Sequence, residues 1–236
     1  MRIPAKMIAI LAVGLALGWG LAVSASATPI LDFGIFVPQP TSSKISFAGG
    51  TAPLVGTDIV VNNVVGIDTP LNAGVSLAIT GGLLNFTTGN FNLGLSSPND
   101  WYFDGGPSST IKITGGIATP SIPPGTTLLS GQFDYAIVLH LSSKFNISGA
   151  NFSDTQYPDL LSFFGLTGSP SPGGNFNIGF YTATTIIPHE SFTSSRVTSG
   201  DVSTSFVPIT ASWLLLGTGL IGIACLGFRR TNFSLV

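Results

Sequence analysis

The sequence predicts an all-β fold, an antiparallel β-sandwich of the jelly-roll kind, flanked by an apolar helix at each end of the chain. Between residues 28 and 206, apolar and polar residues alternate with a period of two, and clusters of Gly, Pro, Asn and Ser interrupt the alternation at short intervals. No long segment with helical spacing separates these strands, so a parallel α/β sheet is not expected. The two helices are predicted from apolar runs near the chain ends.

Residues 1–27 have the pattern of a secretory signal peptide. Arg2 and Lys6 make the start positively charged, and a long apolar run follows. Ala25 and Ala27 frame a small-residue cleavage site at the end of this run. A signal anchor is the alternative, because the apolar run approaches the length of a membrane span. In both cases residues 28–206 form one domain, expected outside the cytoplasm.

The alternating pattern predicts many short strands in this domain. They are expected at residues 30–37, 44–48, 57–67, 75–87, 91–95, 101–103, 110–114, 128–141, 145–147, 176–186, 192–197 and 202–206. A turn or bulge is expected inside the third of them, at Asn62 and Asn63. The sequence Ile-Thr-Gly-Gly occurs at 79–82 and again at 113–116, which indicates either a repeated hairpin or turn residues used twice by chance.

One short helix is expected over residues 157–165, where apolar residues recur at helical spacing. Pro158 suits the first turn of a helix, and Gly165 suits its C-terminal cap. The predicted helix would cover one end of the sheets.

Charge and cysteine content restrict the function. From residue 28 to 210 there are four basic side chains against all ten acidic ones, a formal charge of −6. A nucleic-acid-binding surface needs a basic stripe, so no nucleic acid partner is expected, and an anionic membrane surface is equally unsuited. The one cysteine, Cys225, lies in the C-terminal apolar run, so no disulfide within the chain is possible.

Catalytic chemistry has little support. His140 and His189 are the only histidines, the first expected at the surface of a strand and the second in a loop. No nucleophile motif and no zinc-ligand spacing accompanies them. The sequence therefore predicts a non-enzymatic protein without a cofactor or a metal.

Two carboxylates flank an aromatic strand. Asp100 and Asp104 enclose Trp101 and Tyr102, whose rings form a possible sugar contact. A calcium loop with Asn99 and the two carboxylates is a second interpretation, and a glycosidase pair is a third. The simplest interpretation is a turn on either side of a buried aromatic strand.

The C-terminal region, residues 207–236, reads as a membrane-inserting segment. The uncharged apolar run 211–228 would span about 27 Å as a helix, close to the roughly 30 Å thickness of the hydrocarbon core. Arg229 and Arg230 follow directly and should stay in the cytoplasm.

This region resembles the PEP-CTERM sorting signal. The segment SWLLLGTGLIGI followed by FRR matches the helix and the basic end of that signal. Val207 and Pro208 begin the motif, but Ile209-Thr210 stand where the signal has Glu-Pro. The resemblance implies a Gram-negative bacterium that makes exopolysaccharide, and an exosortase-type enzyme that removes the tail. Retention of the tail as a membrane anchor is the alternative.

These features predict a protein exported through the inner membrane as a membrane-anchored precursor, and then delivered to the cell surface or an exopolysaccharide matrix. Its expected partners are the inner membrane, the exosortase-type processing enzyme and exopolysaccharide. A carbohydrate-binding or adhesive surface module is the second hypothesis, and an extracellular hydrolase is the third.

Overall fold

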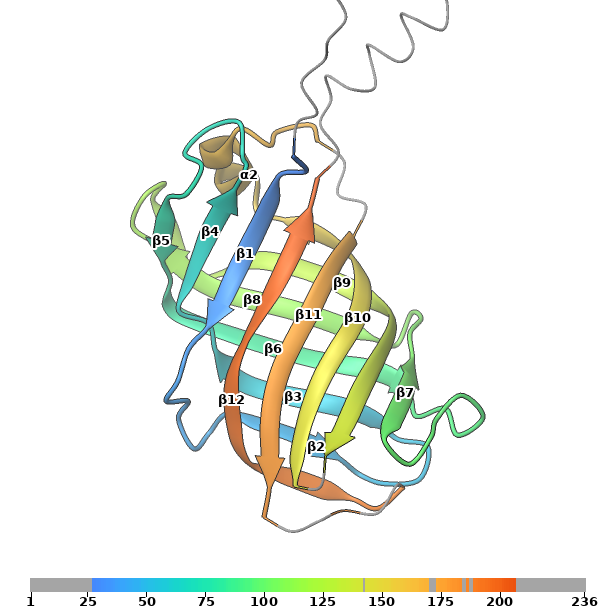
Figure 1. Cartoon of the computed structure of the whole chain (residues 1–236). Helices are drawn as coiled ribbons and strands as arrows, with labels where there is room; N and C mark the ends of the chain where they lie inside the picture. The colour runs from blue at the N-terminus through green and yellow to red at the C-terminus, as the bar shows by residue number, and fades with distance from the viewer. Residues whose placement is uncertain (1–26, 142, 170–172, 184–185, 187–188, 207–236) are drawn as a thin grey trace, which may run out of the picture.

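The computed structural model describes residues 27–141, 143–169, 173–183, 186 and 189–206. These residues form a twelve-stranded antiparallel sheet and one short helix, so the predicted all-β class is confirmed (Figure 1). Nearly all of the predicted signal peptide and the whole of region 207–236, with the predicted helix 211–228, lie outside the described residues. Among the described residues, no helix has the length and apolarity needed to cross a membrane.

The strands occur in the predicted order, but the predicted strand 57–67 divides into β3 and β4, and the predicted strand 75–87 divides into β5 and β6. They are β1 (Ile30–Ile35), β2 (Lys44–Phe47), β3 (Pro53–Val60), β4 (Asn63–Ile67), β5 (Ser76–Ala78), β6 (Thr80–Asn90), β7 (Asp100–Asp104), β8 (Thr110–Ile117), β9 (Ile122–Leu141), β10 (Lys144–Gln156), β11 (Gly173–Thr182) and β12 (Phe192–Ser205). The strand expected at 91–95 is absent from the described structure: Phe91 forms an isolated bridge with Phe103, and the chain then turns.

The predicted sandwich is wrong, because the sheet closes on itself. Eight strands form a barrel in the order β12, β11, β10, β9, β8, β6, β3 and β2, and β2 pairs again with β12. Figure 1 shows the front strands β12, β11 and β10 crossing over β8, β6, β3 and β2 behind them. Alternation of apolar and polar residues is the same in a barrel and in a sandwich, so the sequence pattern does not separate the two.

Long bent strands close the barrel. The sequence predicts separate strands at 192–197 and 202–206, yet β12 runs without interruption through both. Its first residues pair with β2, and its last six pair with β1. A register shift against β11 lies between these two parts, and bulges of this kind bend a strand from one layer of a sheet to the other.

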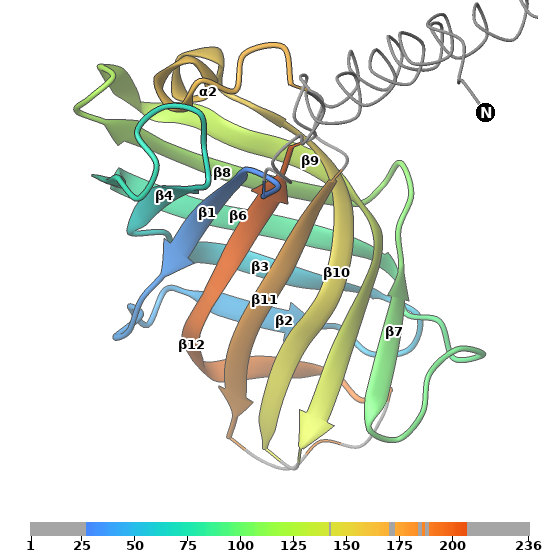
Figure 2. The ribbon, with the colours of Figure 1, turned by 45° about the horizontal axis from the view of Figure 1, so that its top comes forward.

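Strands β1, β4 and β5 continue the front layer beside the C-terminal half of β12. Ile30 at the start of β1 pairs with Ser205 at the end of β12, and Phe206 N–H donates a hydrogen bond to the Pro29 carbonyl at 2.9 Å. The domain therefore begins and ends at the same end of the barrel (Figures 1 and 2).

Eleven of the twelve largest fully buried side chains in the described structure are phenylalanines. Phe86 on β6 and Phe176 on β11 meet edge to face at 5.0 Å, which joins the back and front layers. Near the other end, Phe145 stacks on Phe180 at 5.0 Å and on Phe192 at 5.5 Å. Aromatic pairs in these geometries stabilise a core beyond the area that they bury.

The predicted helix is confirmed as α2 (Pro158–Phe164). Gly165 ends it in the left-handed conformation at φ 71°, and Leu160 and Phe164 are buried. The helix lies at the end of the barrel where the domain begins and ends (Figure 1).

The two Ile-Thr-Gly-Gly segments are neighbours in space. Thr80 on β6 pairs with Gly116 on β8, so the segments face each other across antiparallel strands. At Gly82 a Cβ atom would lie 2.1 Å from the Val61 carbonyl oxygen, so glycine is required for the close approach of the backbones.

Candidate binding groove on the outer face of the barrel

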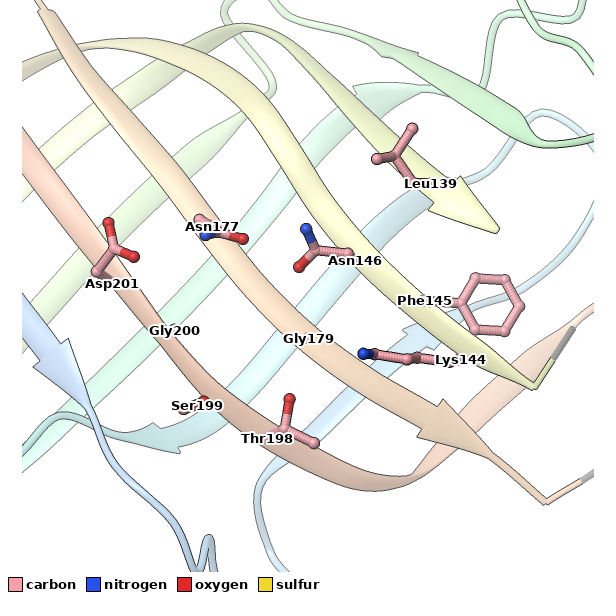
Figure 3. Close-up of a pocket in the computed structure, with 10 residues that line it drawn as sticks. All are labelled: Leu139, Lys144, Phe145, Asn146, Asn177, Gly179, Thr198, Ser199, Gly200 and Asp201. Atoms are coloured by element: carbon pink, nitrogen blue, oxygen red, sulfur yellow. The ribbon is translucent and has the colours of Figure 1, made fainter. Parts of the chain in front are cut away.

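A groove of about 520 Å³ lies on the outer face, where β10, β11 and β12 run side by side. Gly179 and Gly200 form its floor. The other lining residues are the polar Lys144, Asn146, Asn177, Thr198, Ser199 and Asp201 and the apolar Leu139 and Phe145 (Figure 3). The groove is open to solvent rather than enclosed.

Strand alternation places the two asparagines on the outside. On β10, Asn146 lies between the buried residues Phe145 and Ile147, and on β11 Asn177 lies between Phe176 and Ile178. Figure 3 shows the two amides next to each other on neighbouring strands, with Lys144 and Asp201 toward the two ends of the groove.

A β-bulge hollows the groove. Ile178 pairs with Gly200 and Phe180 pairs with Val197, so two residues of β12, Thr198 and Ser199, oppose the single residue between them on β11. That single residue is glycine, and nothing projects from β11 at this point.

The two floor glycines are required by close contacts. A Cβ atom on Gly179 would lie 2.4 Å from Thr198 Oγ1. On Gly200 it would lie 2.2 Å from the Asn177 carbonyl oxygen. A larger residue at either position would displace a wall of the groove.

Two carboxyl groups lie toward one end of the groove. Burial raises the pKa of Asp201 above its ordinary value. Burial, and then the nearby Asp201 charge, raise the pKa of Asp32, which lies on β1 opposite Ser203. One carboxyl oxygen of Asp32 is buried and has no hydrogen-bond partner among the described residues. An anionic ligand would therefore be repelled at this end.

The polar groups of the groove are free to bind. Within the described part of the chain, the side chains of Asn146, Asn177 and Thr198 form no hydrogen bond. An amide has two N–H donors and one acceptor oxygen, and a hydroxyl is both donor and acceptor. The groove thus presents donors and acceptors together, which suits a ligand rich in hydroxyl groups.

The structure separates the two residues of the predicted sugar contact. Trp101 has no exposed surface and packs among core rings, including Phe145 at 5.5 Å. Its indole therefore offers no surface to a sugar. Tyr102 is half-buried on the outer face, where it stacks on Tyr135 with ring centroids 5.8 Å apart and planes 12° apart.

The phenol of Tyr102 stays protonated over the physiological range. Burial first, and then the nearby Asp104 and Tyr135, raise its pKa above the ordinary value of tyrosine. Its O–H is therefore available as a donor.

Asp100 and Asp104 organise the loop before β7. Asp104 accepts a hydrogen bond from the Asn92 amide at 3.0 Å, and Asp100 accepts one from the Ser97 hydroxyl at 3.2 Å. This arrangement corresponds to the simplest interpretation, turns on either side of a buried aromatic strand. Among the described residues, no group of three or more His, Cys, Asp or Glu side chains is placed to hold a metal ion.

The predicted surface position of His140 is wrong. Its ring is half-buried, stacked on Phe145 at 4.6 Å and 5.5 Å from the Trp101 ring. A register shift beside Tyr135 exchanges the faces of β9, so that Phe133 and then Ala136, Val138 and His140 point inward. His189 lies in a turn at φ 77°, as predicted, with its ring 4.8 Å from Phe91.

Sequence reasoning missed the groove. Asn177 and Gly179 are recognisable as alternate, outward positions of one strand, but their neighbours come from strands far along the chain. The outward Asn-x-Asn-x-Gly pattern at 175–179 was the one local signal, since a strand rarely places small and amide residues together on an exposed face without a packing or binding reason.

No family model, curated protein or solved structure matches this chain.

Proposed function

We propose that this chain is an exported, non-enzymatic protein of a bacterial cell surface or exopolysaccharide matrix. The observation that carries the proposal is the pairing of the domain ends, Ile30 with Ser205 and Pro29 with Phe206. The residues that follow the predicted signal peptide and those that precede the predicted sorting region leave the barrel together (Figure 2).

This geometry supports delivery from a membrane. A precursor held by an N-terminal signal and by a C-terminal segment 211–228 has both attachments on the same membrane. Because both ends leave from one side of the barrel, the folded domain can be attached to the membrane at both ends without either connection having to cross the barrel. The C-terminal end with Arg229 and Arg230 resembles that of substrates of exosortase-type enzymes. Removal of region 207–236 by such an enzyme would then free the domain.

The groove lining supports a binding role over catalysis. Its polar groups are amides, hydroxyls, one amine and one carboxylate, and no histidine lies among its lining residues. General acid–base or nucleophilic chemistry needs a nucleophile and a base within hydrogen-bond reach, and in the described groove no hydrogen bond joins Thr198 or Ser199 to another side chain.

Export is tested by cell fractionation. The full chain with a tag inserted in the exposed loop near Leu93 is expressed in a Gram-negative host that encodes an exosortase, and in the same host with that gene deleted. The domain is expected outside the cytoplasm in both hosts. Mass spectrometry is expected to find an Arg229-containing peptide only in the deletion host, in the inner membrane fraction.

A matched variant lacking residues 1–27 is expected to stay in the cytosol. Full-length protein in the cytosol of the unmodified host would contradict the proposal, and an Arg229 peptide in the surface fraction would show that the tail is retained.

A second candidate function is a carbohydrate-binding or adhesive surface module. The stacked pair of Tyr102 and Tyr135 favours it, because exposed tyrosine faces combine an apolar surface with a hydroxyl. Retention of the protein on immobilised exopolysaccharide from the same host, compared with Tyr102→Ala, tests this function. Equal retention of the two proteins would exclude the tyrosine pair as the carbohydrate-binding site.

A further inference from the structure

We propose that the groove between Lys144 and Asp201 binds a neutral polysaccharide, whose chain lies across strands β10, β11 and β12. This inference rests on the second candidate function and gives it a site that is separate from the tyrosine pair. It concerns binding alone and does not depend on how the protein is exported.

The shape of the groove suits a chain. A cavity of about 520 Å³ that is open to solvent can hold part of a polymer whose ends continue beyond it, whereas an enclosed pocket accepts only a terminal unit. No side chain rises from the floor at Gly179 and Gly200, and the Thr198 hydroxyl lies close to Gly179, so the floor itself presents a polar group to the polymer.

The polar groups match sugar hydroxyls. Each hydroxyl of a sugar both donates and accepts hydrogen bonds. The side-chain amides of Asn146 and Asn177 can each do the same. Thr198 adds a hydroxyl from the neighbouring strand. Because these side chains form no hydrogen bond within the described part of the chain, a ligand would not have to break internal bonds to engage them.

Charge selects a neutral polymer. The domain has a formal charge of −6, and the Asp201 end of the groove has Asp32 nearby. An acidic polysaccharide or a nucleic acid would meet this field along its whole length, and Lys144 supplies only one positive charge in the groove. A carboxylate, by contrast, accepts well from neutral sugar hydroxyls.

A protein partner is disfavoured by the same lining. Protein interfaces depend on aromatic, Arg or large apolar anchors buried at their centre. The centre of this groove is glycine, amide and hydroxyl, and its apolar contributors, Leu139 and Phe145, lie on one side (Figure 3).

Affinity electrophoresis of the detergent-solubilised full chain tests the proposal. Native gels contain hydroxyethylcellulose, galactomannan or dextran as neutral polymers, or alginate as an anionic polymer. Wild-type protein is expected to be retarded by at least one neutral polymer and not by alginate. The double variant Asn146→Ala/Asn177→Ala is expected to lose roughly tenfold or more in affinity, since it removes two hydrogen-bonding groups.

The chain offers a matched control. A second open depression of about 420 Å³, with a similar polar lining, lies on the outer face between β8, β9 and β10. Gln132→Ala/Thr155→Ala alters that depression equally and is expected to keep wild-type retardation. Asn177→Trp, which fills the proposed groove without removing its other groups, is expected to abolish retardation while leaving the thermal unfolding midpoint unchanged.

Several outcomes would overturn the proposal. They are no retardation of the wild type by any neutral polymer, retardation by alginate alone, and retardation that survives both groove variants. None of these outcomes bears on export, which the fractionation experiment measures separately.

Discussion

Trp101 shows how burial changes the meaning of a residue. The sequence places it beside Tyr102 in an aromatic strand between two acids, which indicates a surface platform as readily as a core strand. In the structure it has no exposed surface, and its ring lies among Phe47, Phe91 and Phe145. Its indole N–H has no partner among the described residues. Trp101 is thus a core residue that leaves one polar group unsatisfied.

Truncation of this side chain should cost stability rather than binding. Trp101→Ala is expected to lower the free energy of unfolding by about 3–5 kcal/mol, because it leaves a large cavity. Tyr102→Ala, its half-exposed neighbour, is expected to cost only about 1 kcal/mol. Urea denaturation followed by circular dichroism measures both. A smaller loss for Trp101→Ala than for Tyr102→Ala would contradict the packing shown by the structure.

Asp32 and Asp201 should make stability depend on pH in the acid range. Burial raises the pKa of both carboxyls in the folded state, so the folded protein binds these protons more tightly than the unfolded chain does. Between the ordinary carboxyl pKa of about 4 and the raised values, stability therefore falls as pH rises. At neutral pH both ionised groups are a net cost.

Asp32→Asn is accordingly expected to raise the thermal midpoint at about pH 7 and to lose this advantage below about pH 4, where the native carboxyl is protonated. Thermal unfolding at the two pH values, at constant ionic strength, gives the comparison. An equal change in the thermal midpoint at both pH values would mean that the charge of Asp32 does not contribute to the change.

Among the elements, strands and the helix were predictable, and the register shifts that shape them were not. Alternation located the first residues of β1, β2 and β8 and placed their ends within three residues, and Pro158 with Gly165 located α2. The shift beside Tyr135 reverses the faces of the second half of β9. A bulge adds one residue without changing composition, so a period-two pattern that crosses it assigns the wrong face to His140.

The groove was unpredictable for a related reason. Its walls come from β10, β11 and β12, and which strands lie side by side depends on closure of the barrel rather than on any local pattern. The outward position of Asn177 follows from its own strand, but its proximity to Asn146 and Thr198 does not.

The close approach of the backbones at Gly82 and Val61 can be tested by substitution. Gly82→Ala would place a methyl group 2.1 Å from the Val61 carbonyl oxygen, and it is expected to destabilise the protein by about 3 kcal/mol or more. The adjacent Gly81 has φ 60° and open space around it, so Gly81→Ala is expected to cost only about 1 kcal/mol. Similar losses for both variants, measured by urea denaturation, would contradict the packing at Gly82.

In the whole molecule, β12 is the strand that closes the barrel. It pairs with β11 along its length, with β2 at its start and with β1 at its end, so it joins the barrel to the additional strands β1, β4 and β5. The long sequence separation between β12 and β1 or β2 makes closure depend on non-local contacts, which are typical of slowly folding proteins.

Circular permutation tests this arrangement. A domain in which Phe206 is joined to Pro29 by a short linker, with new ends between Leu93 and Gly94, is expected to unfold cooperatively, because the natural ends are already bonded to each other and the Leu93 side chain is 63% exposed. New ends between Ser199 and Gly200, inside β12, are expected to prevent closure. Cooperative unfolding of both permutants, followed by circular dichroism, would show that β12 need not be continuous.

The position of β12 also has a mechanical consequence. The strand carries Asp201 on the groove and, five residues later, Phe206 at the exit of the chain. Tension between a polymer held in the groove and a tail held at a membrane would run along this one strand. The inter-strand hydrogen bonds between Asp201 and Ser205, which hold five residue pairs with β1 and five with β11, lie perpendicular to that pull, so they would be loaded together in shear rather than opened one by one. If the proposed attachment and binding are correct, the barrel would resist drag at the point where its tail leaves it.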